Sequence, residues 1–356
     1  MSHHRQPLVS VIVVAYDAAR YLSLCLGALR QQTYQNIEIL LIDTTPYDSQ
    51  TAAIARQFSE VTLIAATKNL GYAGGNNLGF AHAHGEYIAI LNPDTEPDSS
   101  WLGALVMALE DCPMAGLATS KIVLFDQRWQ INTCGNEVHY TGLATCRGLG
   151  QPSNTYTDSA LVPAVSGAAF LIRRELFARL GGFDERFFMY LEDTDLSWRA
   201  GLQGYSCLFV PTSIVAHHYT TRITPTKLFY LERNRYLMLL QNFQWWTLLL
   251  LVPALVLTEI TTWGFAALHR KHHLHAKVRA CVWIVRHPRL IHTTRRRVQR
   301  IRLKSDAYII RQFGYRLPIE QVSSNVVALP VRFLVEPLFR LWQHLILFLC
   351  TRRESS

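Results

Sequence analysis

Three carboxylates stand close together in the stretch FMYLEDTDLSWRA, which runs from Phe188 to Ala200. Glu192, Asp193 and Asp195 lie within four positions of one another, among residues that are otherwise mostly apolar or aromatic. A neighbouring acid or an apolar wall raises the pKa of a carboxyl group, and a raised pKa suits a general base near neutral pH. The cluster therefore marks a candidate functional site.

Helix capping is the alternative explanation for these acids. Leu196, Ala200 and Leu202 fall on one side of a helix that would end at Gly201 or Gly204. Acids are favourable in a first helical turn because the free backbone N–H groups and the helix dipole are positive there. Capping accounts for one acid more easily than for three, and both interpretations stay open on these residues alone.

The preceding part of the chain alternates strand-like and helix-like segments. We expect strands at 8–16, 37–43, 61–66 and 86–92, and helices at 19–32, 49–60 and 76–85. The short links predict a parallel sheet with helices on both faces, and ligands bind such sheets beyond the carboxyl ends of the strands. Polar residues follow three of these ends, namely Tyr16 with Asp17, Asp43, and Asn92 with Asp94.

The segment NLGYAGGNN, residues 69–77, is rich in glycine, and we expect a loop that opens the next helix. Such a loop can present backbone N–H groups to phosphate, although a flexible turn without a ligand is the alternative. The chain has no G-x-x-x-x-G-K-[ST] motif, which disfavours a P-loop kinase or ATPase.

Charge is distributed unevenly along the 356 residues. Residues 1–225 carry 14 Lys and Arg against 20 Asp and Glu, whereas residues 226–356 carry 21 against 6, a net charge of +15. A basic region with long apolar runs suits an anionic membrane surface better than nucleic acid, so we expect no nucleic-acid partner. The seven scattered cysteines indicate a reduced, intracellular compartment.

Six segments, taken in order, resemble the family 2 inverting glycosyltransferases with a GT-A fold. They are VSVIVVAYD, IEILLIDTTPYDS, NLGYAGGNNLGF, YIAILNPDTEP, VSGAAFLIRRELFARLGGFDERFFMYLEDTDLSWR and IVAHH, within about residues 8–242. The branch they resemble most is the bacterial rhamnosyltransferase-type enzymes of surface polysaccharide synthesis. The resemblance implies an α/β fold with a Rossmann-like mixed sheet, a GT-A glycosyltransferase domain at 1–225, and a membrane-associated helical region at 226–356.

On the donor side, the resemblance implies a site for a nucleotide-diphosphate sugar. Tyr16 and Asp43 would hold the base, and the segment 69–77 would border the diphosphate. Asp94 and His217 would bind a divalent cation, Mg²⁺ or Mn²⁺, that neutralises charge on the leaving diphosphate. The implied donor-binding residues are Ala15, Tyr16, Asp43, Asn69, Gly71, Asn77 and Asp94. Without the resemblance, His217 and His218 would be interpreted as ordinary histidines at a strand end.

On the acceptor side, the resemblance implies that Asp193 takes the proton from the attacking hydroxyl while Glu192 supports it. Gly167 and Asp195 would lie near the acceptor, a glycan or a polyprenyl-linked sugar. One displacement at the anomeric carbon would invert its configuration, and rhamnose is one expected sugar. A catalytically weakened nucleotide-sugar or membrane-binding protein and a processive polysaccharide synthase remain the alternatives.

The basic region holds two apolar stretches. Residues 245–268 have the length and the terminal tryptophans of a membrane-crossing helix. Because nucleotide sugars are cytosolic and the flanking segments are basic, a helix in the interface or re-entering the same leaflet fits better than a span, and a buried core helix is the alternative. Residues 326–350 predict a second, amphipathic helix that lies on the membrane or packs on the first. We therefore expect the protein at the cytoplasmic face of the cell membrane.

Overall fold

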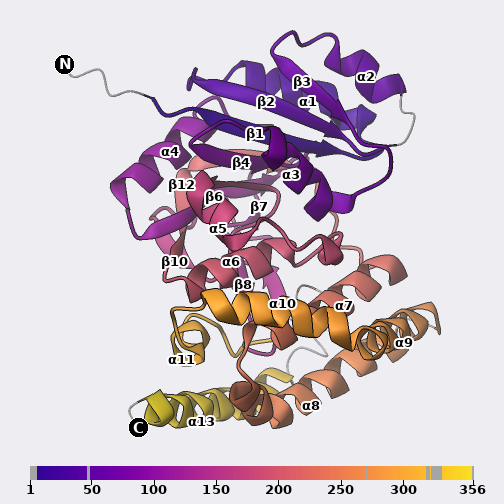
Figure 1. Cartoon of the computed structure of the whole chain (residues 1–356), viewed down its shortest axis with the longest axis vertical. Helices are drawn as coiled ribbons and strands as arrows, with labels where there is room; N and C mark the ends of the chain where they lie inside the picture. Colours follow the sequence, from indigo (N-terminus) through magenta and orange to yellow (C-terminus); the bar gives the residue numbers. More distant parts are fainter. Residues whose placement is uncertain (1–5, 46–48, 269–270, 318–320, 322–330, 355–356) are drawn as a thin grey trace. The chain divides into compact units, whose positions relative to one another are not determined.

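The computed structural model describes residues 6–45, 49–268, 271–317, 321 and 331–354, and these form two compact units (Figure 1). The first unit comprises the described residues up to Asn136, together with Cys146–Ala200 and Tyr205–Tyr219. The second comprises Glu137–Thr145, Gly201–Gly204 and the described residues from Thr220 onward. The functional division between residues 225 and 226 stays a prediction.

A mixed sheet of ten strands forms the centre of the first unit, with the order β10-β12-β6-β11-β4-β1-β2-β3. In addition, β5 pairs with β12 and β7 with β6, whereas β8 and β9 form a separate two-stranded sheet. The strands are β1 Val9–Ala15, β2 Ile37–Asp43, β3 Val61–Ala65, β4 Tyr87–Leu91, β5 Thr95–Pro97, β6 Ala115–Leu124, β7 Ile131–Thr133, β8 Asn136–Val138, β9 Ala144–Cys146, β10 Ala160–Val162, β11 Ala169–Arg173 and β12 Ser206–His217.

The four strands predicted from the sequence are parallel neighbours, because β1 pairs in parallel with both β2 and β4, and β2 with β3. Beyond them, β11 runs antiparallel between β4 and β6. The parallel pairing predicted for the four alternating strands is therefore confirmed, and so is the mixed sheet that the family resemblance implies, because the later strands add antiparallel pairs.

Helices cover both faces of this sheet, as the buried apolar strands require. The helices of the first unit are α1 Ala19–Arg30, α2 Ser49–Ala55, α3 Gly71–His82, α4 Trp101–Asp111, α5 Arg174–Leu180, the 3₁₀ turn η1 Glu185–Phe187 and most of α6 Glu192–Leu202. Leu22 and Leu26 of α1 share a buried cluster with Val11 and Val13 of β1. The opposite face of β1 is covered by α3, whose Gly79 lies against Ile12.

The helix α3 begins at Gly71, five residues earlier than expected, so the segment 69–77 is mostly helix and not loop. Asn69 Oδ1 accepts a hydrogen bond from Gly71 N (2.8 Å) at the helix start. The glycines serve close packing: a Cβ atom added at Gly79 would lie 2.5 Å from Ile12 Cγ2, and one added at Gly75 would lie 2.5 Å from Val14 Cγ1. Tertiary packing thus overrides the low helix propensity of glycine.

The second unit is a group of helices. They are α7 Pro225–Asn242, α8 Trp245–Leu268, α9 Lys271–Arg286, α10 Pro288–Ile301, α11 Asp306–Ile310, the π-helical turn η3 Val331–Val335 and α13 Glu336–Glu354. The bounds of α8 confirm the helix predicted at 245–268, and α13 covers most of the second predicted helix, whose residues 326–330 lie outside the described residues. Among the described residues, the helices at 245–268 and 333–353 are long and apolar enough to cross a membrane.

Paired charges hold three helices of this unit together. Glu232 of α7 accepts hydrogen bonds from Arg235 Nη2 (2.9 Å) and Lys277 Nζ (2.7 Å). Glu259 of α8 bonds the same two cations and accepts a hydrogen bond from Tyr236 Oη (2.8 Å). Burial works to raise the pKa of Glu232, but the two cations outweigh it and lower that pKa, which keeps the carboxylate charged.

The packing of α3 on β1 leads to a stability prediction. Gly79→Ala and Gly27→Ala bring the same gain in helix propensity, but nothing lies within 4 Å of a Cβ atom added at Gly27 of α1. We therefore expect the Gly79 variant to be less stable than the Gly27 variant by about 1–3 kcal/mol, the usual effect of overpacking a core. Thermal unfolding of both variants measures the difference, and equal melting temperatures would contradict the close contact.

Candidate active site

The predicted nucleotide-binding residues meet at the carboxyl ends of β1 and β2. Ala15 and Asp43 are partners in the register of these two strands. Thr44 N donates to Ala15 O (2.9 Å), and Asp43 Oδ1 accepts from Thr45 N (2.9 Å). Asp43 is buried, whereas Tyr16 is exposed directly after β1. The structure therefore brings Ala15, Tyr16 and Asp43 together at one sheet edge, where ligands of such sheets bind.

Asp94 and His217 also lie together, although 123 positions separate them in the chain. In the antiparallel pairing of β5 with β12, His217 is the partner of Thr95, the residue after Asp94. His217 Nε2 lies 3.4 Å from Asp94 Oδ1, and His218 N donates to Asp94 O (3.1 Å). The imidazole of His218 instead stacks on Phe125, with ring centroids 3.7 Å apart. The two adjacent histidines therefore have different environments.

Asn132 of β7 orients His217, a contact that sequence reasoning missed. His217 Nδ1 donates to Asn132 Oδ1 (2.9 Å), which leaves the lone pair of Nε2 facing Asp94. Asp94 Oδ1 is buried and accepts no hydrogen bond. With a neutral imidazole protonated on Nδ1, His217 Nε2 and Asp94 Oδ1 are two electron-pair donors that fit a shared cation, and holding the second imidazole nitrogen is how proteins orient metal-binding histidines.

Across the described part of the chain, no group of three or more His, Cys, Asp and Glu residues is placed to hold a metal ion. Asp94 and His217 would thus supply two protein ligands to the predicted cation, and its further ligands would have to come from a bound diphosphate. A hard cation such as Mg²⁺ is commonly held in this way, by one or two protein groups and substrate phosphates. The donor set therefore fits the predicted cation.

The three acids occupy the first turn of α6, as the sequence predicts, but they have different surroundings. Asp193 Oδ1 accepts a hydrogen bond from Thr194 N (2.6 Å), and Asp193 Oδ2 accepts one from Gly167 N (2.7 Å). Asp195 is fully buried, and its Oδ2 accepts from Arg199 Nε (2.7 Å) one helical turn later. Asp195 therefore makes a buried ion pair, and this geometry supports a structural role for it; its predicted acceptor-side role stays untested.

Gly167 lies between Asp193 and a tyrosine from α3. Gly167 O accepts a hydrogen bond from Tyr72 Oη (2.6 Å). A Cβ atom at Gly167 would lie 3.1 Å from that hydroxyl oxygen and 3.2 Å from Asp193 Oδ2, closer than side chains usually pack. The position therefore favours glycine. Gly167 is a residue that the family resemblance implies to lie near the acceptor. Tyr72 lies in the glycine-rich segment 69–77 but was not among the residues predicted to form the site.

Asn136 is a second neighbour of Asp193 that the sequence did not reveal. Its Nδ2 donates to Asp193 Oδ2 (3.2 Å) and to Val165 O (3.1 Å). Together with Gly167 N, this amide fixes the orientation of the carboxylate. Nothing in the local pattern around Asn136 distinguishes it, because its contact partner lies 57 positions away.

The segment before α6 has an unusual backbone. Phe188, Tyr190 and Leu191 all have positive φ angles, between 63° and 67°. Non-glycine residues rarely adopt this conformation, and each such residue costs roughly 1–3 kcal/mol unless its surroundings impose it. Phe188 O accepts a hydrogen bond from Ala73 N (3.2 Å), which ties the segment to α3. The strained run leads directly into Glu192 and Asp193.

Burial changes the acidity of the catalytic candidates. Burial raises the pKa of Glu192 well above its usual value, and the charge of Asp193 adds to the effect. Burial also raises the pKa of Asp193, while hydrogen bonds from Gly167 N and Thr194 N oppose the rise. Glu192 Oε2 is buried without a hydrogen bond, as suits a protonated carboxyl group. Asp193, with hydrogen-bond donors on both oxygens, is the better placed of the two to be a charged base.

The other residues predicted to bind the donor, Asn69, Gly71 and Asn77, make contacts within the protein. Asn69 holds the start of α3 through Gly71. Asn77 Nδ2 donates to Phe183 O (2.9 Å), and Asn77 Oδ1 accepts from Phe183 N (2.9 Å). The amide of Asn77 is thus engaged with the loop after α5, and its contact with a donor stays a prediction.

Gly167 and Ala168 connect the Asp94–His217 pair with the acids at the start of α6. Ala168 O accepts a hydrogen bond from Asn92 N (2.9 Å), two residues before Asp94. The preceding Gly167 N donates to Asp193. The turn before β11 thus joins the end of β4 to the start of α6, so one short segment positions both groups of acids.

Comparison with known proteins identifies relatives of this chain. The model of the family described as glycosyl transferase family 2 matches residues 10–181. The N-acetylglucosaminyl-diphospho-decaprenol L-rhamnosyltransferase of Mycobacterium tuberculosis is 27% identical over 235 residues, which cover 59% of this chain and 76% of the relative. The O-antigen biosynthesis protein RfbC of Myxococcus xanthus is 32% identical over 60% of this chain, but the match spans only 17% of that protein.

Solved structures show that the fold is of the GT-A type. TarS of S. aureus in complex with UDP-GlcNAc superposes with a TM-score of 0.54 at 15% identity, over 85% of this chain and 90% of that one. GalNAc-T7 with UDP, GalNAc and Mn²⁺ gives a TM-score of 0.53 at 19% identity, over 66% of this chain and 48% of that one. At such identities the likeness concerns the fold alone.

The buried Glu192 carboxyl leads to a pH-dependence prediction. Because folding raises its pKa, its stabilising effect is complete below its unfolded pKa of about 4.3 and is lost as the pH rises through the raised value. Glu192→Gln stays neutral, so its melting temperature should rise relative to that of the unmodified protein as the pH increases above the unfolded pKa of about 4.3. Glu175 is exposed, so Glu175→Gln is the control. If the melting temperatures of Glu192→Gln and of the unmodified protein changed in parallel with pH, the burial of Glu192 would be contradicted.

Proposed function

Because this chain is a family 2 glycosyltransferase, we propose that it transfers one sugar, with inversion, from a nucleotide-diphosphate donor to a lipid-linked glycan acceptor. The observation that carries this proposal is the Asp193 carboxylate, whose Oδ2 accepts hydrogen bonds from Gly167 N and Asn136 Nδ2. These donors hold a buried base in one orientation beside the segment that leads to Asp94.

The reaction needs one proton transfer and one displacement. An acceptor hydroxyl donates its proton to Asp193 as its oxygen forms a bond to the anomeric carbon of the sugar. The bond from that carbon to the nucleotide diphosphate breaks, and the electron pair leaves with the phosphate oxygen. The raised pKa of Asp193 makes it a stronger base than an exposed aspartate, which favours its taking the proton.

The protein residues on the donor side bind and orient the nucleotide. Tyr16 and Asp43 receive the nucleobase at the sheet edge, and Asp94 with His217 would hold a divalent cation. When bound, that cation would neutralise negative charge on the diphosphate. Asn132 keeps the Nε2 atom of His217 directed towards Asp94.

The relatives guide the choice of donor and acceptor. The Mycobacterium tuberculosis protein is named for L-rhamnose transfer to N-acetylglucosaminyl-diphospho-decaprenol. We therefore assign rhamnose as the first sugar to test and a diphospho-polyprenol-linked sugar as the acceptor class. Such an acceptor is held in a membrane, so the basic region 226–356 would attach the enzyme to the anionic, cytoplasmic face of the cell membrane.

The role of Asp193 is tested by Asp193→Asn. The amide keeps the size of the side chain but cannot take the proton, so the transfer rate should fall by roughly 10²–10⁴ while donor affinity is retained. Single-turnover transfer and donor binding on the same folded preparation measure both quantities.

Asp195→Asn is the matched control for this experiment, because it changes a buried acid in the same helical turn. It should lower the melting temperature through loss of the Arg199 ion pair and should affect transfer far less. If Asp193→Asn also changed only stability, the acids would be helix caps and the proposed mechanism would be wrong.

The cation role is tested by nucleotide binding. Asp94→Asn should weaken the binding of the donor nucleotide in the presence of Mn²⁺, whereas both proteins should bind it equally in excess EDTA. Titration calorimetry with and without the metal gives the four affinities. His218→Gln is the control, because the His218 ring stacks on Phe125 and does not face Asp94, so this variant should keep the metal dependence. Full transfer activity in excess EDTA would rule the cation out.

A further inference from the structure

One face of α8 is apolar and exposed. The exposed apolar residues recur every three or four positions, which places them on one side of the helix. They are Trp245, Leu249, Val252, Val256 and Ile260. The opposite side is buried and includes Leu251, Ala254 and Thr258. A soluble helix normally exposes its polar side, so the exposed apolar side of α8 requires an explanation.

The helix α13 has the same arrangement. Its exposed apolar residues are Leu338, Leu341, Leu345 and Phe348, again spaced by three or four positions. Its buried side includes Phe339, Gln343, Ile346 and Cys350. The two helices are in contact, since Trp342 Nε1 donates to Leu250 O (2.8 Å), and Figure 1 shows them next to each other.

The buried sides of both helices pack on the same short segment of the second unit. Thr258 Oγ1 of α8 donates to Thr141 Oγ1 (3.0 Å). Tyr140 Oη donates to Phe339 O of α13 (3.0 Å). The exposed sides of α8 and α13 therefore both turn away from residues 140–141. We call these exposed residues the apolar face: Leu249, Val252, Val256, Ile260, Leu338, Leu341, Leu345 and Phe348.

Arginines stack on the aromatic rings at the ends of these helices. Arg353 lies 5.3 Å from the ring centroid of Trp246. Arg352 lies 4.5 Å from the ring centroid of Phe348. Guanidinium groups above aromatic rings at the border of an apolar surface match the boundary between lipid head groups and acyl chains.

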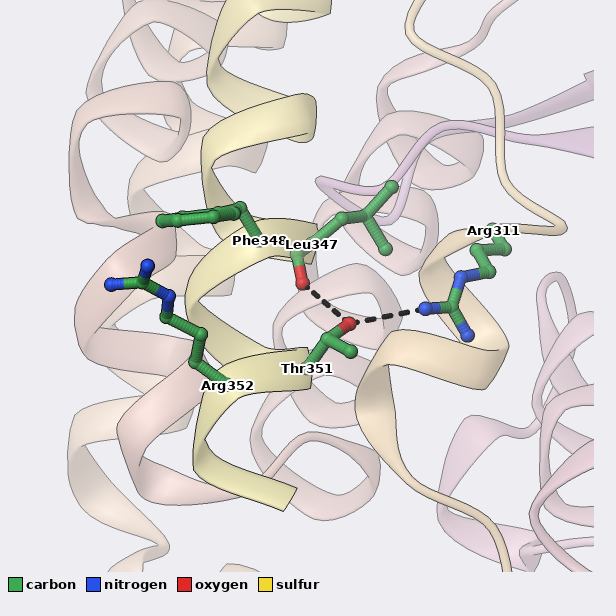
Figure 2. Close-up of a pocket in the computed structure, with 5 residues that line it drawn as sticks. All are labelled: Arg311, Leu347, Phe348, Thr351 and Arg352. Atoms are coloured by element: carbon green, nitrogen blue, oxygen red, sulfur yellow. Dashed lines mark hydrogen bonds between the residues drawn. The ribbon is translucent and has the colours of Figure 1, made fainter. Parts of the chain in front are cut away.

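A pocket at the carboxyl end of α13 has the same chemical character. It is an open surface depression of about 400 Å³, lined by Arg311, Leu347, Phe348, Thr351 and Arg352. Figure 2 shows Arg311 donating to Thr351 Oγ1 (3.0 Å) and Arg352 beside Phe348. The two guanidinium groups lie on opposite sides of α13 in Figure 2, so each suits a separate phosphate beside the apolar side chains. Because Phe348 also belongs to the apolar face, the pocket and the face are continuous.

A transmembrane α8 does not agree with its packing. Glu259 of α8 is paired with Lys277 of α9 (3.1 Å), and α9 lies along α8. The outer side of α9 exposes Arg279 and Arg286. A spanning α8 would take these arginines into hydrocarbon, where charged side chains are strongly unfavourable. Only the face of α8 opposite its packed side is free to enter a membrane.

A second copy of the chain is also a poor partner for the apolar face. In a symmetric dimer the same surface would meet itself, and Arg311, Arg352 and Arg353 would face their own copies. The region 226–356 has a net charge of +15, so such pairing would bring like charges together. Anionic lipid head groups neutralise the same charges.

We infer that α8 and α13 together dock the protein on one leaflet of an anionic membrane without crossing it. The apolar face enters the acyl region, and the exposed Arg311, Arg352 and Arg353 at its border bind lipid phosphates. This docking surface rests on the membrane attachment proposed for the region 226–356 and specifies which residues make it, but it does not depend on the identity of donor or acceptor.

Flotation with sealed vesicles tests the docking surface on the full-length protein. The vesicles contain phosphatidylcholine and phosphatidylglycerol. Leu249→Glu and Leu341→Glu should each weaken binding to them by about tenfold or more, because each removes a leucine side chain that the membrane would bury. Met107→Glu and Met114→Glu are matched controls, since Met107 and Leu249 are both 61% exposed, and Met114 and Leu341 both 67%. Equal binding by all four variants would overturn the proposal.

The lipid-phosphate contacts have their own variants. Arg311→Gln with Arg352→Gln should weaken binding to vesicles containing phosphatidylglycerol by roughly fivefold for each charge, and should leave binding to pure phosphatidylcholine unchanged. Inorganic phosphate should not compete if the lipid is the ligand. Competition by phosphate, or dissociation of a dimer by Leu249→Glu without loss of vesicle binding, would assign the surface to another ligand.

Labelling of cysteines at the two ends of α8 tests the position in one leaflet. Gln244→Cys and Leu268→Cys proteins, bound to the outside of sealed vesicles, are treated with a membrane-impermeant maleimide and analysed by peptide mass spectrometry. Docking on one leaflet predicts equal modification at both positions. Protection of one end until the vesicles are opened would show a span. Donor binding by each variant is measured in parallel, so that failure of docking is distinguished from failure of the transferase domain.

Discussion

The site depends on a carboxylate that is buried and yet hydrogen-bonded. Asp193 lies where burial disfavours its charge, and N–H groups of Gly167 and Thr194 offset that cost. A buried charge without such partners would become protonated and would lose its use as a base. The glycine at 167, the tyrosine at 72 and the strained turn before α6 all serve this arrangement, because each fixes a neighbour of Asp193.

Strand register provides the second constraint. The pairing of β5 with β12 brings Asp94 beside His217, and the neighbouring β7 supplies Asn132 to hold the imidazole. A shift of one residue in β12 would exchange the positions of His217 and His218, because alternate residues of a strand face opposite sides. Which of the two histidines lies beside Asp94 is therefore decided by the sheet and not by the histidines themselves.

The second unit solves a different electrostatic problem. Glu232, Arg235, Glu259 and Lys277 carry two negative and two positive charges, and each is paired. Removal of a single member would leave an unpaired charge in a buried position, which is strongly destabilising. The network also explains Glu259, the acid inside the apolar helix α8, since that acid binds helices α7 and α9 of its own unit.

Local pattern was sufficient for those features of the sequence whose cause is local. The buried strands, α1, the whole of α8 and the acidic first turn of α6 follow from apolar periodicity and residue type. The early start of α3 did not follow, because its glycines are selected by contact with β1 and not by helix propensity. Asn132, Asn136 and Tyr72 were missed for a related reason: each acts on a residue between 57 and 95 positions away. Sequence by itself determined which acids and histidines were available for chemistry, whereas the tertiary structure decided which of them are buried, paired and oriented, because register and packing between distant segments set those properties.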